Sequence, residues 1–275
     1  MFVKAIEDCV KFTKPLLSGQ LIYKDKRIIN GISTLMVLNK DGDILTTAHV
    51  AEFFRMADEV NDAFWSILNE FKDKSPKEIK KIEAKYGIKE SDIVAIHNVI
   101  IDVAANPGKL NVIIHPTLDM ALIKLENKQE IFVDEFPIFR KSNVKVGEMI
   151  CKIGFAFPEY DTFYYDEDAC LIKTHNKIMN FPLFPLEGMV TRNMIDQTGD
   201  ISIFEMSTPL FPGQAGGPVF DTKGHICGML LGTKRIASNY GEQMNFHYDL
   251  GMAFHVQSIT DFLDKHQISY NKASK

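Results

Sequence analysis

The stretch that decides the fold of this 275-residue chain is Pro212-Gly213-Gln214-Ala215-Gly216-Gly217-Pro218-Val219-Phe220-Asp221. Its glycines suit a tight turn, because glycine adopts backbone conformations that are closed to other residues. The apolar run that follows the turn is typical of a short buried strand. A glycine-rich turn before a strand is common, so its meaning depends on what else the chain carries.

Two further segments carry residues that can exchange protons. Thr46-Thr47-Ala48-His49-Val50 follows the apolar pair Ile44-Leu45, and Leu118-Asp119-Met120-Ala121-Leu122-Ile123-Lys124-Leu125 places an acid before a strand-like run. Each is a weak signal by itself. The order of histidine, aspartate and glycine-rich turn is far more specific, because acyl transfer uses a base, a group that orients it and a nucleophile.

Together these segments resemble those of the trypsin-like serine peptidases, most closely the bacterial HtrA (Deg-type) branch. His49 lies in a T-x-A-H-V segment and Asp119 in a D-x-A-L-I-K-L strand, while Gly213–Asp221 matches G-N-S-G-G-P-V-F-D in seven of nine positions. The resemblance covers residues 30–262. It implies an all-β fold of two antiparallel six-stranded β-barrels, with the site in the cleft between them.

The resemblance also implies a role for each residue. His49 is expected to act as general base and then general acid, with Asp119 orienting its imidazole. The N–H groups of Gly213 and of residue 215 are expected to form an oxyanion hole. Ala215, however, stands where the family carries its nucleophilic serine. A methyl group cannot attack a carbonyl carbon, so the chain as given is expected to be inactive.

Three interpretations of Ala215 stay open. A serine endopeptidase inactivated by a deliberate Ser→Ala change keeps its base, its orienting acid and its oxyanion glycines, which is the pattern seen here. A natural pseudo-peptidase would instead use the intact cleft as a peptide- or protein-binding module. A third interpretation is an effector domain within a larger complex. Retention of the remaining machinery favours the inactivated endopeptidase.

Short apolar runs separated by turn signals predict a β-rich chain. We expect one peptidase unit with an N-terminal barrel lobe over residues 1–128 and a C-terminal barrel lobe over residues 129–275. A capping signal at Ser258–Asp261 and a short apolar stripe after it predict a C-terminal helix. The chain stops soon after that stripe, so no PDZ domain is expected.

One region departs from the β pattern and predicts an inserted helical hairpin at about residues 50–87. Ser75-Pro76-Lys77-Glu78 has the form of a capping box with proline at the first helical position, and Gly87 is a plausible stop. The preceding helix is indicated by apolar residues spaced three and four apart: Phe53, Ala57, Val60, Phe64, Ile67 and Phe71. We expect a regulatory protein or another copy of the chain to bind this hairpin. A second candidate regulatory segment, Phe157–Leu186, is expected to form a flap over the cleft.

The resemblance places substrate-binding residues in the second lobe. Pro209 is expected at the base of the first specificity pocket, where it offers no charge to a basic side chain. Leu231, Gly232 and Thr233 are expected to pair with the substrate backbone as an added strand. His255 is a candidate for contacting the substrate side chain. Gln214 replaces the acid that zymogen-activated relatives carry, so that activation switch is not expected.

Composition excludes other classes of function. The formal net charge is −5, without the basic clustering typical of nucleic-acid-binding proteins. We find neither a signal peptide nor a run of apolar residues long enough to span a membrane, so a cytoplasmic enzyme is expected. The four cysteines lack metal-ligand spacing, and no metal or cofactor is expected. The expected partner is a protein or peptide substrate.

Overall fold

The computed structural model describes residues 1–104, 110–125, 130–157, 162–175, 181–195, 199, 201–239 and 245–274. The N-terminal lobe is built on a six-stranded antiparallel sheet with the order β4-β1-β2-β3-β6-β5. Its strands are β1 (Thr13–Ile22), β2 (Ile28–Val37), β3 (Ile44–Thr46), β4 (Ile93–Ile100), β5 (Leu110–Ile114) and β6 (Ala121–Leu125). Among the described residues no pairing joins β4 to β5, so this lobe is a half-barrel.

The register between β3 and β6 positions the candidate site. Thr46, the last residue of β3, pairs with Ala121, the first residue of β6. His49 lies three residues after Thr46, and Asp119 lies two residues before Ala121. Both residues therefore lie at the same corner of the sheet. The apolar residues paired between these strands are fully buried, which fixes the register.

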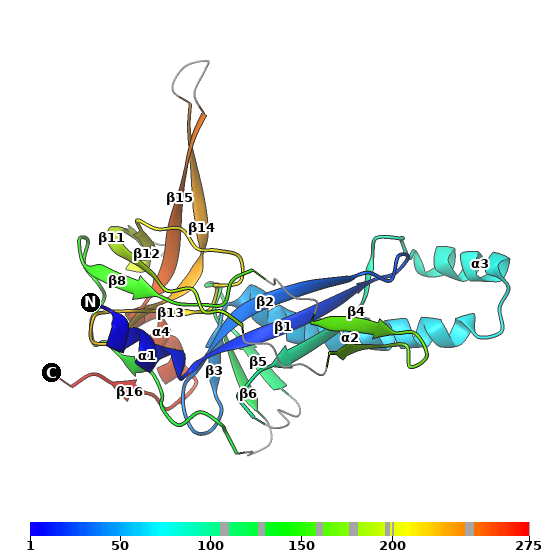
Figure 1. Ribbon diagram of the computed structural model, residues 1–275, viewed down its shortest axis with the longest axis horizontal. Helices are drawn as coiled ribbons and strands as arrows, with labels where there is room; N and C mark the ends of the chain where they lie inside the picture. The colour runs from blue at the N-terminus through cyan, green and yellow to red at the C-terminus, as the bar shows by residue number, and fades with distance from the viewer. Residues whose placement is uncertain are drawn as a thin grey trace.

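The C-terminal lobe contains a closed ring of six antiparallel strands, β13-β8-β11-β12-β15-β14, which the β13–β14 pairing completes. These strands are β8 (Met149–Lys152), β11 (Leu186–Ile195), β12 (Ile201–Met206), β13 (Pro218–Phe220), β14 (Ile226–Asn239) and β15 (Asn245–His255). Two short strands, β7 (Ile138–Phe139) and β16 (Asn271–Lys272), extend the sheet beside β14 in parallel. The predicted all-β, trypsin-like architecture is confirmed, and Figure 1 shows the outer part of β14–β15 rising from the body as a two-stranded ribbon.

The inserted helical hairpin consists of α2 (Ala48–Phe71) and α3 (Pro76–Tyr86), which project from the body on the right of Figure 1. The predicted capping box is present, with the Ser75 N–H donating to Glu78 Oε2 at 2.9 Å. Gly87 ends α3 in the left-handed conformation, as its position predicts. Of the helices in the described ranges, none is both long and apolar enough to cross a bilayer.

Polar side chains fasten α2 to the edge strand β4. Asn61 donates from Nδ2 to the carbonyl of Ile96 and accepts from the N–H of the same residue, both at 2.9 Å. Asn98 donates to the Phe53 carbonyl at 2.8 Å. Of the predicted apolar stripe, only Phe64 is buried, and the other members are partly exposed. The near half of α2 is therefore held to the sheet through edge-strand hydrogen bonds as well as apolar contact.

Two further helices flank the lobes. The N-terminal helix α1 (Val3–Val10) was not predicted from the sequence. The C-terminal helix α4 (Val256–Lys265) buries Ile259, Phe262 and Leu263, as expected. Its predicted start was wrong, because the helix begins at Val256 with His255 in the N-cap position rather than at Ser258.

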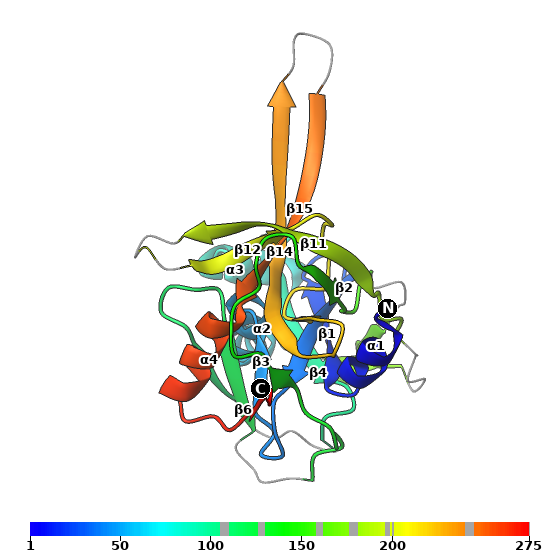
Figure 2. The same ribbon diagram turned by 90° about the vertical axis from the view of Figure 1, so that its left-hand side faces the viewer.

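The candidate flap is described only in part, since residues 158–161 and 176–180 lie outside the described residues. Its described strands, β9 (Phe163–Asp166) and β10 (Leu171–Thr174), form an antiparallel hairpin. Phe163 and Ile172 are buried in a cluster with Leu17, Ile32 and Phe64. This hairpin therefore packs on the first lobe and α2, although the chain enters it from the second lobe. Figure 2 shows the two lobes from the side that faces away from the α2–α3 hairpin.

Candidate active site

The histidine and aspartate predicted to act together are in direct contact. His49 Nδ1 lies 2.6 Å from Asp119 Oδ2, and the backbone N–H of His49 donates to Asp119 Oδ1 at 2.9 Å. A carboxylate at this distance holds the proton on Nδ1, which leaves Nε2 unprotonated and able to accept one. The imidazole is about half exposed, with 53% of its side-chain surface accessible. Much of the ring is therefore open to solvent, and Thr47 Oγ1 lies 3.4 Å from Nε2.

Asp119 also caps helix α2. Its carboxylate accepts the backbone N–H groups of Ala48 and His49, which belong to the first turn of the helix and have no partner within it. Burial opposes ionisation of this carboxyl, but the hydrogen bonds from His49 and Ala48 outweigh burial and lower the pKa of Asp119. Asp119 is therefore a carboxylate at neutral pH.

The loop that carries Ala215 is shaped by glycines pressed against the first lobe. Gly213 and Gly216 have φ values of +99° and +87°. A Cβ placed on Gly216 would lie 2.2 Å from the Thr34 carbonyl oxygen and 2.4 Å from Thr46 Oγ1. Only glycine fits this approach, and it brings the loop into contact with the strand that leads to His49.

Thr34, on β2, ties the two lobes together at this loop. Its Oγ1 donates to the Gly213 carbonyl at 2.8 Å and accepts from the Phe155 N–H at 2.9 Å. Its N–H donates to the Ala215 carbonyl at 3.3 Å. Thr34 was not among the predicted site residues, because a threonine in a strand carries no signal of an inter-lobe contact. It fixes the direction of the Gly213–Gln214 and Ala215–Gly216 peptide groups.

The two N–H groups predicted to form the oxyanion hole have no hydrogen-bond partner in the described part of the chain. Neither the Gly213 N–H nor the Ala215 N–H donates to a described backbone or side-chain acceptor, while the Gly216 N–H is used by the Leu230 carbonyl at 2.9 Å. Backbone N–H groups without a partner are the donors that an oxyanion hole requires. The methyl group of Ala215 leaves the loop without a nucleophilic atom.

Gln214 has a structural role beneath this loop. The side chain is fully buried. Its Oε1 accepts the Phe211 N–H at 2.9 Å, and its Nε2 donates to the Phe184 carbonyl at 3.0 Å. Both ends of the amide are thus satisfied by nearby backbone without any charged partner.

The predicted substrate-binding strand borders an open space. Leu231 lies at an irregularity where β14 shifts register against β15, and a Cβ placed on Gly232 would meet nothing within 4 Å. Thr233 Oγ1 accepts the Leu210 N–H at 2.9 Å and donates to the Leu210 carbonyl at 3.0 Å. The Thr233 side chain therefore fastens the loop that contains Pro209 to this strand.

A buried lysine that the sequence did not single out lies under the predicted pocket base. Lys152 is 0% exposed, and its Nζ donates to the carbonyls of Thr208 and Pro209 at 2.6 and 2.8 Å and to Thr208 Oγ1 at 3.0 Å. Burial lowers the pKa of Lys152 to about 8. No carboxylate pairs with this ammonium within the described residues, so neutral oxygens alone solvate it.

The position of His255 argues against its predicted contact with substrate. The side chain is completely buried, with Nε2 3.1 Å from Asn193 Oδ1 and its ring centroid 4.7 Å from that of Phe204. Burial lowers the pKa of His255 to about 4. A side chain without exposed surface cannot touch a substrate, and this one belongs to the core of the second lobe.

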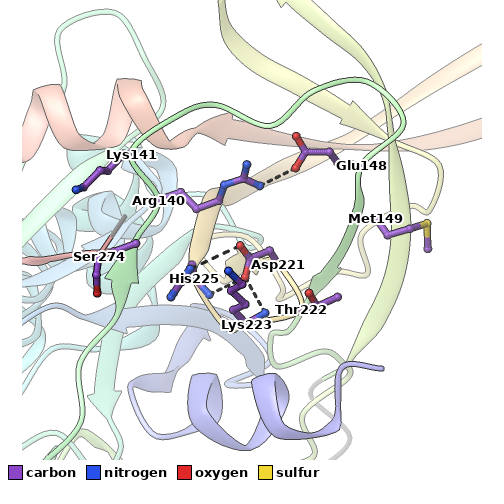
Figure 3. A pocket seen from close by; sticks show the side chains of 10 residues that line it. Arg140, Lys141, Glu148, Met149, Asp221, Thr222, Lys223, His225 and Ser274 are labelled. Atoms are coloured by element: carbon purple, nitrogen blue, oxygen red, sulfur yellow. Dashed lines mark hydrogen bonds and ion pairs between the residues drawn. The ribbon is translucent and has the colours of Figure 1, made fainter.

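Figure 3 shows a separate pocket of about 500 Å³ on the second lobe. Asp221, the last residue of the glycine-rich segment, contributes to it by accepting the N–H groups of Lys223 and His225 at 2.8 and 3.0 Å. Across the pocket, Arg140 pairs with Glu148 at 2.7 Å. None of the predicted site residues lines this pocket.

Within the described ranges no group of His, Cys, Asp and Glu side chains could hold a metal ion.

Comparison with known proteins finds many solved structures similar to this chain. No curated protein sequence matches the chain. Similar solved structures include Rv3671c from M. tuberculosis H37Rv, as an inactive serine-to-alanine mutant (12% identity, TM-score 0.47, covering 96% of this chain and 92% of that one). The active form of Rv3671c protease gives 11% identity, a TM-score of 0.48 and coverage of 97% and 86%.

A third solved structure is an HtrA-type protease, a serine-to-alanine variant of AlgW with a decapeptide. It shows 11% identity and a TM-score of 0.51, and the match covers 97% of this chain and 68% of that chain. At such low identity the likeness is one of fold. The family model for a trypsin-like peptidase domain matches residues 33–229, which include His49, Asp119 and Ala215. The chain belongs to the trypsin-like peptidase family.

Proposed function

We propose that this chain has the machinery of a serine endopeptidase in which Ala215 occupies the nucleophile position, so that the protein with Ala215 is an inactivated form. The observation that carries the proposal is the contact of 2.6 Å between His49 and Asp119, on the lobe against which the Ala215 loop is pressed. Family membership alone does not establish activity. The paired imidazole and carboxylate supply the specific chemistry.

With serine at position 215, each residue has a defined task. His49 Nε2 takes the proton of the serine hydroxyl as the oxygen attacks the scissile carbonyl carbon. The N–H groups of Gly213 and residue 215 bind the resulting oxyanion. His49 then passes its proton to the leaving amine, and water hydrolyses the acyl-enzyme by the same route. Asp119 keeps the tautomer and stabilises the imidazolium.

The test uses the Ala215→Ser protein beside the unchanged chain. Both are treated with a fluorophosphonate probe, which labels only an activated serine, and labelling is read by intact mass. We expect one label on the Ala215→Ser protein and none on the unchanged chain. The matched control is Ala215→Ser with His49→Gln, which keeps the serine but loses the base, and its labelling should fall to background.

The alternative is a pseudo-peptidase that binds a peptide or protein without cutting it. It is favoured by Ala215 itself, together with the unused N–H groups and the open space beside Gly232. A correctly folded Ala215→Ser protein that the probe fails to label would support this alternative and contradict the enzyme proposal. In that case the next measurement is peptide binding to the unchanged chain.

We further propose a protein partner, or a second copy of the chain, at the α2–α3 hairpin. The proposal is supported by exposed apolar side chains on these helices, Met56, Trp65 and Tyr86, which are 46%, 39% and 45% exposed. Similarity of the His49, Asp119 and Ala215 segments to the HtrA branch supports a protein substrate. Deleting 66–85 in the Ala215→Ser protein should alter labelling or oligomeric state, and no change in either would contradict this docking role.

A further inference from the structure

His115 lies inside the short loop that carries Asp119. Its Nδ1 accepts the backbone N–H of Leu118 at 2.9 Å and that of Thr117 at 3.2 Å. The His115 N–H donates to the Met120 carbonyl at 2.8 Å, which closes the loop across its base. The imidazole thus acts as the acceptor around which the residues just before Asp119 are folded.

This geometry dictates the protonation state of the ring. A nitrogen that accepts two N–H groups must be unprotonated, so the single proton of neutral His115 lies on Nε2. Adding a second proton turns Nδ1 into a donor that faces two other donors. Both hydrogen bonds are then lost, and the Thr117 and Leu118 N–H groups are left without their acceptor.

The surroundings of the ring come from α4 of the second lobe. The ring centroid of His115 lies 5.0 Å from that of Phe262 in an edge-to-face arrangement, and His266 packs on the same phenylalanine at 5.0 Å. The groups that act electrostatically on His115 in the described structure are Lys265 and His266. Burial lowers the pKa of His115 below its ordinary value, and electrostatic repulsion from Lys265 and His266 lowers it further.

We propose that His115 is a positioning residue that holds Asp119 against His49 only while its imidazole is neutral, so that acidification uncouples the catalytic pair. This inference rests on the proposed function. It assigns to the chain a response to pH that originates at His115. The response is transmitted by the loop from His115 to Asp119, whose carboxylate in turn accepts the His49 backbone N–H at 2.9 Å.

The first test needs no activity and uses the chain as it stands. Backbone amide resonances of Thr117, Leu118 and His49 are followed by NMR from about pH 8 to about pH 4, because the lowered pKa of His115 moves its protonation to more acidic pH than that of an ordinary histidine. We expect all three to shift together as His115 gains a proton. The matched control is His115→Asn, whose side-chain oxygen can accept both N–H groups but does not titrate.

In the control, the Thr117 and Leu118 shifts should vanish, and the His49 amide should shift less than it does in the unchanged chain. If the Thr117 and Leu118 amides ignore pH in the unchanged chain, the proposed switch is wrong. If they respond but the His49 amide moves identically in the unchanged chain and in His115→Asn, then coupling to Asp119 is wrong.

The second test measures labelling by the fluorophosphonate in the Ala215→Ser protein. His115→Leu should slow labelling by about tenfold or more at neutral and alkaline pH, where His115 is neutral, because misplacing a catalytic group by about 1 Å has effects of at least this size. His115→Asn should restore most of the rate and retain more of it at acidic pH than the protein that keeps His115. Equal acid sensitivity with and without the His115→Asn change would contradict the inference.

Failure of this inference is distinguishable from failure of the proposed function. If the Ala215→Ser protein is never labelled, the peptidase proposal fails, while the NMR titration still decides whether His115 controls the Asp119 loop. If His115→Leu does not fold, as judged by its thermal unfolding, then the comparison between the protein that keeps His115 and its His115→Asn variant decides the question alone.

Discussion

The first-lobe half of the site is held by charge, whereas the second-lobe half is held by backbone shape. In the first lobe a single carboxylate, Asp119, orients the His49 ring and caps α2. In the second lobe Gly213 and Gly216 adopt positive φ angles, which let their backbone pack closely against the first lobe at Thr34. Both halves orient a group of the candidate site, the His49 ring in the first lobe and the loop at position 215 in the second, but by different physical means.

This difference determines which perturbations each half resists. An electrostatic arrangement responds to pH and to neutralising substitutions that barely change volume. A steric arrangement ignores pH but cannot accept one additional carbon atom where the backbone approaches closely. Each half should therefore fail under the perturbation that the other half tolerates.

The largest effect is expected for Asp119→Asn in the Ala215→Ser protein. The amide has nearly the volume of the carboxylate but favours the wrong imidazole tautomer and cannot stabilise imidazolium. In triads of this type the corresponding change lowers kcat about ten-thousand-fold, roughly 5 kcal/mol. The rate of fluorophosphonate labelling provides the measurement. A loss below about tenfold would show that charge does not hold the first half of the site.

A smaller but still severe effect is expected for Gly216→Ala. The new methyl would overlap the Thr34 carbonyl and force a left-handed residue, which should lower the free energy of unfolding by about 4 kcal/mol. The matched control is Gly232→Ala on the same lobe, where the added methyl meets nothing and the change should stay within about 0.5 kcal/mol. Denaturant unfolding measures both, and equal effects would refute the steric account.

The smallest of these effects is expected for Lys152. This buried cation lies in the second lobe, whose half of the site is otherwise held by backbone shape and not by charge. Because its pKa is lowered to about 8, the unfolded chain holds more protons than the native protein between that pH and the ordinary lysine value. The free energy of unfolding should therefore rise with pH across this window, by up to about 3 kcal/mol. Lys152→Met should remove this rise.

The measurement is the free energy of unfolding at several alkaline pH values in the unchanged chain and in Lys152→Met. Lys81→Met, at an exposed position of α3, is the control and should leave the rise intact. A rise that survives in Lys152→Met would mean that the buried ammonium stays charged through this range and that the three oxygen acceptors outweigh its burial.

Much of the fold was predictable because its signals are local. The capping box at Ser75 and the glycine stop at Gly87 depend only on neighbouring residues, and both are confirmed. Helix α1 was missed because it is short and its N-cap, Phe2, has no capping side chain. The packing of Phe163 on the first lobe could not be predicted either, because a contact between distant segments leaves no periodic pattern in the sequence.

For the site, the sequence identified residues whose roles follow from motif order, and the contact of His49 with Asp119 agrees with that pairing. It could not identify residues that act through tertiary contact. Lys152 has the pattern of an ordinary strand residue, and lysines are seldom fully buried. The prediction for His255 failed for the opposite reason, since a polar residue near the expected pocket proved to lie inside the core.

The capping of α2 by Asp119 has a consequence for how the site opens. The first turn of this 24-residue helix cannot fray without releasing the carboxylate that also holds His49. Local melting of the insert and disassembly of the pair are thus one cooperative event rather than two. Hydrogen exchange at the His49 amide therefore reports, without any assay of activity, the fraction of molecules in which His49 and Asp119 are paired.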